Sequence, residues 1–428
     1  MSSNPFLQND SGGAGSTTAT KIAGQTIQRP NADISVPARK PSRHLSLYPE
    51  RAGYDLRDEL DFLTYRAIEP NVFFSARFMA PAMPRIEDKT IRLMIMRDED
   101  ETRSRMRFLM PFTVERSGLS LRKPFIRAWS NPYGPLGTPL LDEEGAAETL
   151  DNLFETLNDK VLRLPPILVI PNARLDGPFV QLLRAVAASR NLPIAETDRF
   201  ERPMLQSLLD GETYLKQSMS TKHVRDRRRL RKQLSKLGDL TYDVARQAEE
   251  IRFRMEEFLA LEASGWKGQR RSAMVVDRYR AAFAREAITG LAESDNVRIH
   301  TLNLDGEAIA STVVFIMSGT AYTWKTAFNE TYRNYSPGQL LMDDLTTTHL
   351  DDPNIVITDS CAVPDHPVMS RLWRERCNMG TLVLGLTPSS DRHIHQVAKQ
   401  LPATSCAVSS DVNSKSAVSQ RTIATRFL

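Results

Sequence analysis

The stretch from Arg333 to Gly338 contains the residue types of a helix start that binds an anion. Ser336 suits an N-cap, Pro337 suits the first helical position, and Gly338 lets a ligand approach the backbone closely. The amides and the partial positive charge of such a helix start form a site for a diphosphate, and the first turn has no acidic residue to repel it. Arg333 would add a charge-assisted contact. An ordinary capped helix would have the same residues, so the order of the surrounding helices and strands must distinguish an anion site from a plain helix start.

A second charged stretch lies upstream. Lys222 to Lys236 contains eight Lys or Arg residues and one acid, Asp226, on a predicted helix. A solvated helix face, a site for an anionic acceptor, a site for the phosphates of a ligand and an RNA-binding surface are all open as explanations. RNA is the least favoured of these because no aromatic residues alternate with the basic ones.

The three cysteines indicate neither a metal site nor a disulfide framework. Cys361, Cys377 and Cys406 have no close Cys-x-x-Cys or His partner in the sequence, so we expect no metal and reduced thiols. Cys361 is interpreted as a small apolar thiol in a loop rather than as a nucleophile, since no histidine stands at a motif-like distance.

The chain of 428 residues is long enough for two domains and flanking tails. Its 41% apolar and 25% charged residues are ordinary globular values, which argue against a fibrous or wholly disordered protein. No stretch approaches the roughly 20 apolar residues of a membrane span, and the first residues are polar, so we expect a cytoplasmic protein. The net charge of +4 does not by itself imply a nucleic-acid partner.

Two stretches of similar size follow the same loose order of helices and strands, which suggests a weak internal duplication. Residues 45–205 and 211–388 are predicted to be two domains, and the apolar-poor ends, 1–44 and 389–428, are predicted to be flexible tails. The elements predicted in the first domain are helices at 55–67, 143–157 and 177–189, and strands at 91–96, 106–115, 123–129 and 167–170. This is an α/β pattern.

The second domain is predicted to place an antiparallel meander between two groups of helices. Asp305-Gly306 and Ser318-Gly319 are turn dipeptides that would join the three strands of the meander. The elements predicted here are helices at 214–237, 248–266, 276–292, 336–349 and 367–375, and strands at 297–304, 307–317, 321–328, 355–359 and 381–386.

This order and several motifs resemble the GNAT acetyltransferase family, in particular its CelD-like branch of cellulose biosynthesis proteins. The motifs are Arg225-Asp-Arg-Arg-Arg-Leu-Arg-Lys-Gln-Leu234, Trp266-Lys267-Gly268, the segment 302–310 and Tyr335-Ser-Pro-Gly-Gln-Leu-Leu341. The resemblance implies an α/β fold of two tandem GNAT-like units, each a mixed, mostly antiparallel sheet flanked by helices. Asp359 and Trp373 match the branch, but its usual Gly and Tyr-Lys are absent from the segments 359–362 and 369–373.

The resemblance implies that acetyl-CoA or another acyl-CoA donates an acyl group directly to an amine. The implied cofactor-binding residues are Trp324, Lys325, Thr326, Arg333, Ser336, Pro337, Gly338, Gln339 and Leu340. Asp359 is our first candidate to contact or deprotonate the acceptor, and His366 is a second candidate base. Tyr335, like Tyr332, is a candidate to protonate the departing thiolate. Each of these residues also has a plain packing, turn or solvated-loop interpretation.

The identity of the acceptor is open, and a small molecule, a sugar amine or a protein in exopolysaccharide or envelope metabolism would fit the branch. Fem peptidyltransferases also contain tandem units, so transfer from aminoacyl-tRNA is a second hypothesis, and a non-catalytic regulatory module is a third. Trp266 either covers the core edge or lines the acceptor pocket. The acyl chain length and the oligomeric state are also open.

The first half is predicted to lack the cofactor. Its equivalent helix begins Leu141-Asp142-Glu143-Glu144, which places carboxylates where the phosphates would bind. Charge repulsion at this helix start should prevent coenzyme A binding. We therefore expect the cofactor in residues 211–388 and a scaffolding or substrate-shaping role for residues 45–205.

Overall fold

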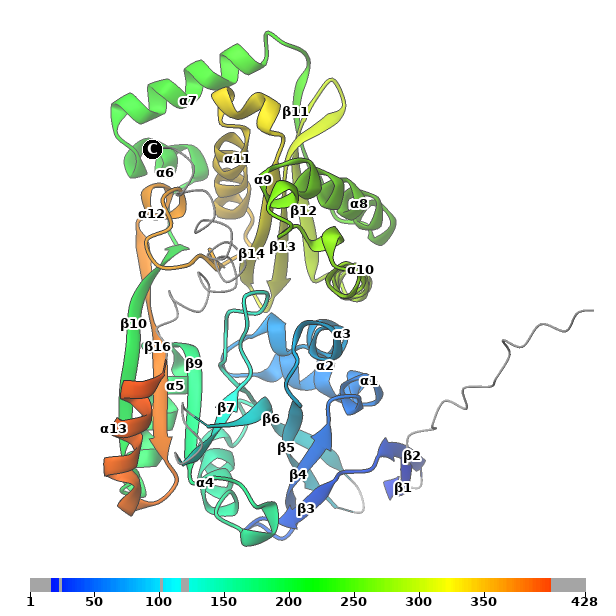
Figure 1. Cartoon of the computed structure of the whole chain (residues 1–428), viewed down its shortest axis with the longest axis vertical. Helices are drawn as coiled ribbons and strands as arrows, with labels where there is room; N and C mark the ends of the chain where they lie inside the picture. The colour runs from blue at the N-terminus through cyan, green and yellow to red at the C-terminus, as the bar shows by residue number, and fades with distance from the viewer. Residues whose placement is uncertain (1–16, 23–24, 101–102, 117–122, 402–428) are drawn as a thin grey trace, which may run out of the picture.

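A computed structural model describes residues 17–22, 25–100, 103–116 and 123–401 (Figure 1). One mixed sheet runs through both halves of the chain in the order β11-β12-β13-β14-β15-β10-β16-β9-β7-β6-β5-β4-β3, and β8 pairs with β6. The hairpin of β1 (Thr17–Ile22) and β2 (Gln25–Pro30) is separate from this sheet. None of the helices in the described part of the chain is long and apolar enough to cross a membrane.

The first half contributes strands and helices that agree with most of the predicted elements. Its strands are β3 (Ile34–Pro37), β4 (Arg43–Pro49), β5 (Arg92–Glu99), β6 (Ser104–Arg116), β7 (Pro124–Ala128), β8 (Leu140–Leu141), β9 (Ile167–Arg174) and β10 (Ile194–Leu205). Its helices are α1 (Ala52–Asp55), α2 (Arg57–Arg66), α3 (Ala76–Ile86), α4 (Ala146–Thr156) and α5 (Pro178–Ser189), with short 3-10 turns η1 (Val72–Phe74) and η2 (Lys160–Leu162).

The second half contributes the meander and the helices that pack on it. Its strands are β11 (Leu240–Ala245), β12 (Val297–Leu304), β13 (Glu307–Met317), β14 (Thr320–Phe328), β15 (Ile357–Asp359) and β16 (Glu375–Gly385). Its α-helices are α6 (Gly211–Ser218), α7 (Thr221–Leu234), α8 (Ala248–Ser264), α9 (Trp266–Gln269), α10 (Arg278–Glu293), α11 (Pro337–Asp351), α12 (Met369–Leu372) and α13 (Asp391–Gln400). The 3-10 turns are η3 (Met274–Val276), η4 (Glu330–Tyr335) and η5 (Pro388–Ser390).

Two strands, β10 and β16, join the two halves of the chain in one sheet. β10, from the first half, pairs with β15 at Met204 and Leu205, and β16, from the second half, lies between β10 and β9 (Figure 1). The cores are joined as well, since Phe78 of α3 makes edge contacts with Phe283 of α10 and Phe315 of β13. The predicted boundary near residue 205 therefore does not separate two independent bodies.

The two predicted tails are partly wrong. Residues 25–44 include β2, β3 and the start of β4, and buried Arg29 pairs with Glu59 and Glu99. At the other end, α13 packs on β10 and β16 through buried Ile394 and Val397. Ion pairing and a short amphipathic helix order these segments although their composition is polar. Residues 1–16 and 402–428 of the predicted tails lie outside the described residues.

Both predicted hairpin turns of the meander are confirmed. Asp305 and Gly306 have φ values of 52° and 82°, and Ser318 and Gly319 have φ values of 47° and 76°. Two successive left-handed residues are the type I′ geometry that matches the twist of antiparallel strands. The turns fix the register, so neighbouring residues of β13 alternate between cores, with Val313 against α8 and α10 and Val314 against α11.

The predicted helix at 214–237 is two helices. The chain is extended at Met219 and Ser220, and the Ser220 hydroxyl accepts the His223 amide as the cap of α7. The unpredicted strands β10 and β11 contain charged residues at exposed or half-buried positions, so neither shows a clear apolar run. Their pairing partners, not local propensity, make them strands.

Two histidines form a buried polar cluster between β12 and α11. The Tyr242 hydroxyl lies 2.7 Å from His300 Nδ1, and His349 Nδ1 lies 2.9 Å from the Thr358 hydroxyl. The Nε2 atom of each ring has no hydrogen-bond partner among the described residues. Burial lowers the pKa of both rings, that of His349 to about 4, and the charge of His349 adds to the lowering at His300. Both rings are neutral in the folded protein at pH 7.

We expect this cluster to make the fold sensitive to acid. Between pH 6.5 and about 4, the unfolded chain binds a proton at His349 that the folded chain excludes. The free energy of unfolding should therefore fall by about 1.4 kcal/mol per pH unit through this residue. Urea titrations at pH 7.5 and 5.0 should show a smaller loss for His349→Gln than for wild type. His395→Gln, at an exposed position, is the control, and an equal pH dependence in all three proteins would contradict the prediction.

Candidate functional site

The strands β14 and β15 part soon after they begin to pair. Their parallel pairing covers Thr320–Tyr322 and Ile357–Asp359, and β14 then continues to Phe328 with no strand beside that edge in the described chain. A cleft of about 610 Å³ lies where they separate, and we call it the β14–β15 cleft. The free backbone edge of β14 can pair with the amides of an extended ligand, as a neighbouring strand would.

A β-bulge marks the β14 wall of this cleft. Lys325 is opposite Val313 and Thr323 is opposite Val314, so Trp324 is the extra residue on β14. The bulge turns the strand at the point where it leaves β15. The Thr323 hydroxyl spans the start of the gap by donating to the Ser360 carbonyl at 2.8 Å.

The start of α11 forms the next part of the wall. Ser336 is the N-cap residue, but it has a left-handed backbone (φ 52°, ψ 51°) and its side chain makes no capping bond, unlike the predicted cap. The amides of Gln339 and Leu340 both donate to the Ser336 carbonyl. Pro337 has no amide hydrogen, which leaves the Gly338 amide as the donor of this turn that lines the cleft. The first turn contains no acid.

Most of the predicted site residues meet at this cleft. The lining includes Trp324, Lys325, Thr326, Arg333, Ser336, Pro337, Gly338, Gln339 and His366. Leu340 is 1% exposed and belongs to the core beneath α11, where Tyr335 and Tyr332 pack against it. Neither side chain lines the cleft, and the roles of Leu340 in binding and of Tyr335 in protonating a thiolate stay predictions.

Asp359 is also not in the lining. Its side chain is buried, with Oδ2 3.4 Å from the Nη1 atom of buried Arg202 and Oδ1 accepting the Cys361 amide at 2.7 Å. Asp359 therefore lies behind the lining of the cleft, and its role with the acceptor stays a prediction. Its carboxylate fixes the loop after β15, which forms the far wall of the cleft.

His366 lines the cleft as a neutral ring. Its Nδ1 atom accepts the amides of Val368 and Met369 at 3.3 and 3.2 Å, so the hydrogen of the neutral ring is on Nε2. Burial lowers the pKa of His366 and keeps it uncharged at pH 7. A ring in this tautomer donates a hydrogen bond through Nε2, which differs from the base role predicted for it.

Cys361 also lines the cleft but is a poor nucleophile. Burial raises the pKa of its thiol well above the ordinary value, and the nearby Asp359 carboxylate raises it further. A thiol that stays protonated does not attack carbonyl carbon readily. This agrees with the prediction of an inert loop thiol.

A buried carboxylate that the sequence did not reveal lies behind the cleft. Glu262 Oε1 is 3.1 Å from the ammonium groups of both Lys267 and Lys325, and Oε2 accepts the Met274 amide at 2.8 Å. Burial alone would raise the pKa of Glu262, but the charges of the two lysines outweigh it and lower the pKa. In the sequence Glu262 resembles any other glutamate of an amphipathic helix. Only the nearby Trp266-Lys267-Gly268 motif indicated that this part of the chain could belong to the site.

The first half supports the wall of the cleft. The Trp324 indole donates to the Tyr133 carbonyl at 2.7 Å, and the Tyr322 hydroxyl donates to the Pro70 carbonyl at 2.8 Å. The Lys325 ammonium lies 5.3 Å from the centroid of the Tyr133 ring. Residues of the first half therefore hold β14 in place next to its bulge.

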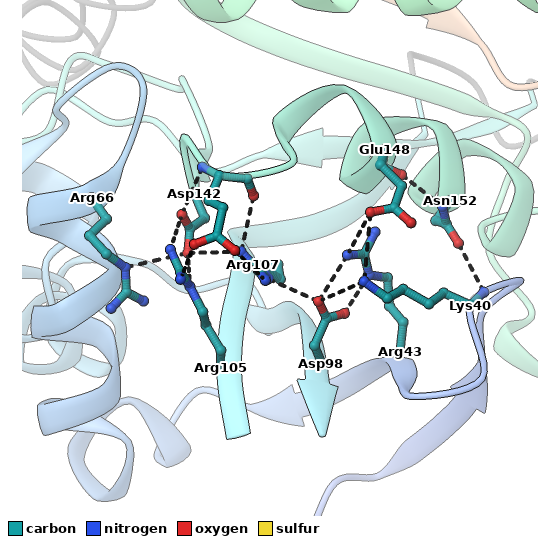
Figure 2. A network of polar contacts seen from close by, with 10 residues as sticks. Lys40, Arg43, Arg66, Asp98, Arg105, Arg107, Asp142, Glu148 and Asn152 are labelled. Atoms are coloured by element: carbon teal, nitrogen blue, oxygen red, sulfur yellow. Dashed lines mark hydrogen bonds and ion pairs between the residues drawn. The ribbon is translucent and has the colours of Figure 1, made fainter. Parts of the chain in front are cut away.

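The turn of the first half that corresponds to the α11 start is filled by its own ion pairs. Figure 2 shows Asp142 among Arg66, Arg105 and Arg107, and it is fully buried. Arg105 binds both carboxylate oxygens, at 2.7 and 2.8 Å, and Glu144 also pairs with Arg105 and Arg107. The carboxylates of Asp142 and Glu144 are thus paired with arginines and occupy this turn. That the first half does not bind coenzyme A stays a prediction.

The basic helix α7 has a structural inner face. Arg227 and Arg231 pair with Asp343 and Asp344 of α11 at 3.2 and 2.7 Å. The remaining cations of the stretch are mostly exposed. Within the described residues, no group of three His, Cys, Asp or Glu side chains could hold a metal ion.

This chain is similar to known proteins in part of its sequence and in its fold. Residues 221–349 match the family described as the acetyltransferase (GNAT) domain. The crystal structure of FemX aligns with 80% of this chain and 98% of its own length, at 8% identity and a TM-score of 0.50. A conserved protein of unknown function from Bacteroides thetaiotaomicron aligns with a TM-score of 0.48 and 11% identity, over 78% of this chain and 97% of that one. Among proteins of curated function, none is detectably similar in sequence.

The second half of the chain therefore contains a GNAT acetyltransferase domain. The whole chain has the tandem GNAT-like α/β fold that the sequence predicted, with the two units joined in one sheet.

We expect Asp359 to be required for stability. Asp359→Asn leaves the Arg202 guanidinium buried without its charge partner, which should lower the free energy of unfolding by about 3 kcal/mol. Denaturant titration of this variant beside Asp365→Asn, an exposed position in the same loop, measures the effect. Wild-type stability in Asp359→Asn would contradict the structural role.

Proposed function

We propose that this protein is an acyl-CoA-dependent N-acyltransferase, with acetyl-CoA as the donor. The observation that carries the proposal is the early parting of β14 from β15 beside an acid-free helix start. These features give a backbone edge for an extended arm and an anion site for a diphosphate in one cleft. The resemblance to the CelD-like branch supports a role in exopolysaccharide or envelope synthesis.

In this proposal, the Gly338 amide and the Arg333 side chain bind the diphosphate of the coenzyme. The β14 edge at Thr323–Thr326 pairs with the amides of the pantetheine arm, so the thioester lies near the Trp324 bulge. The walls of the cleft hold the acceptor nitrogen near the carbonyl carbon, which supplies the proximity that direct transfer requires.

The acceptor nitrogen attacks the thioester carbon, the C–N bond forms, the C–S bond breaks and the coenzyme leaves as a thiolate. His366 donates its Nε2 hydrogen bond to the atom that gains negative charge. No carboxylate is in the lining of the cleft among the described residues, so the amine gives its proton to solvent. Cys361 stays protonated, which is consistent with transfer that has no covalent enzyme intermediate.

A second candidate is transfer of an amino acid from aminoacyl-tRNA, the Fem-type reaction. The alignment with FemX over 98% of its length and the exposed cations of α7 favour it. It shares the cleft with the first candidate but differs in the donor. RNA that copurifies with the protein, together with indifference to coenzyme A, would select this candidate.

Acetyl-CoA binding tests the first candidate. A Cβ atom at Gly338 would meet the Phe328 ring at 3.4 Å, an ordinary contact, so larger side chains can be accommodated. Gly338→Glu places a negative charge beside the diphosphate site, and Gly338→Gln adds the same bulk without the charge. By calorimetry we expect Gly338→Glu to bind acetyl-CoA at least ~10-fold more weakly than Gly338→Gln, because each tenfold corresponds to about 1.4 kcal/mol of charge repulsion. No acetyl-CoA binding by wild type, or equal affinity of the two variants, would argue against this site.

A further inference from the structure

One corner of the β14–β15 cleft has an excess of positive charge. Lys267 and Lys325 line the cleft there, and both bind the same oxygen of Glu262. Arg280 is close enough for its charge to act on Lys325, and it lies 6.0 Å from the Tyr133 ring that Lys325 also faces. Two ammonium groups therefore share one carboxylate, and the guanidinium of Arg280 adds a third positive charge nearby.

The lysines keep hydrogen-bonding capacity for a ligand. An ammonium group has three N–H donors. Among the described residues, Lys267 uses two of them, on Glu262 and on the Thr326 carbonyl, and Lys325 uses one on Glu262. The ring of Tyr133 stabilises the Lys325 charge without using an N–H donor.

No acid in the lining offsets this charge. The cleft wall contains Lys267, Lys325 and Arg333 but neither Asp nor Glu among the described residues. Glu330 lies nearby, where its carboxylate accepts the Trp266 amide at 2.6 Å, and it is outside the lining. Arg333 belongs to η4, next to the start of α11, whereas Lys267 comes from α9 and Lys325 from β14. The lysine corner is thus formed by residues of other elements than the Arg333 and Gly338 of the proposed diphosphate site.

We propose that the acceptor amine is part of a molecule with an oxyanion group, a carboxylate or a phosphate, which Lys325 and Lys267 bind. This inference rests on the proposed function. An oxyanion gains charge-assisted hydrogen bonds in this corner, and a polycationic acceptor such as a lysine-rich peptide would be repelled. Glu262 is a positioning residue, because its buried carboxylate holds both ammonium groups at the wall. Trp266, 42% exposed beside Lys267, offers an apolar face for the rest of the acceptor.

The binding of small anions can test this corner of the cleft although the acceptor is not identified. The protein is first saturated with acetyl-CoA, which occupies the α11 end of the cleft. Binding of inorganic phosphate is then followed by phosphorus NMR line broadening, and binding of acetate by saturation-transfer NMR, so the two arms separate the two oxyanion classes. We expect at least one of them to bind wild type, and Lys325→Met to weaken it ~10-fold, as loss of one charge-assisted hydrogen bond predicts.

Two further variants keep the result interpretable. Lys325→Met leaves Glu262 paired with Lys267, and Arg280→Met removes the third cation without touching that pair, so we expect both variants to fold, as thermal unfolding will show. Lys216→Met removes one cation from the surface of α6 and should leave anion binding unchanged. Normal acetyl-CoA binding with no anion binding, or with anion binding that Lys325→Met and Arg280→Met leave unchanged, overturns this inference alone. Failure of wild type to bind acetyl-CoA overturns the proposed function, and this inference with it.

Discussion

The separation of β14 from β15 is the constraint on which the site depends. A strand that loses its neighbour leaves amides and carbonyls without partners, and buried backbone groups of this kind are costly unless something satisfies them. Here the bulge at Trp324 bends the strand, and the Thr323 hydroxyl replaces the first lost contact. The remaining edge faces a cleft instead of a strand, so the same geometry that weakens the sheet makes a place for an extended ligand.

The first half of the chain contributes to the site as a support. It holds β14 through the carbonyls of Tyr133 and Pro70, and it supplies Arg202, the charge partner of Asp359 in the opposite wall. Because β10 and β16 each lie among strands of the other half, neither wall could keep its position if the halves moved apart. A tandem arrangement with one open cleft is therefore a single mechanical unit.

Buried charges are distributed unevenly around the cleft. Asp343 and Asp344 pair with Arg227 and Arg231 on the side of α11 that faces α7, and burial raises the pKa of Asp343 to about 7. The carboxylates near the cleft are thus held behind its walls by arginines and lysines, whereas cations and amide donors reach its surface. A cleft with this distribution favours anionic groups at both ends, which is the common physical basis of the proposed donor and acceptor sites.

The sequence by itself determined the local parts of this protein. The turn dipeptides at 305–306 and 318–319 could be predicted, because backbone geometry there depends on two adjacent residues. The place where α11 starts could also be predicted, but the left-handed backbone of Ser336 could not. The alternation of helices and strands predicted the α/β class, and the predicted site residues include nine of the twenty residues that line the cleft. Only the tertiary structure decided that Asp359 is buried against Arg202 and that Glu262 holds two lysines, because each contact joins residues far apart in the sequence. It also decided the exchange of β10 and β16, since polar strands take their conformation from the neighbours they pair with.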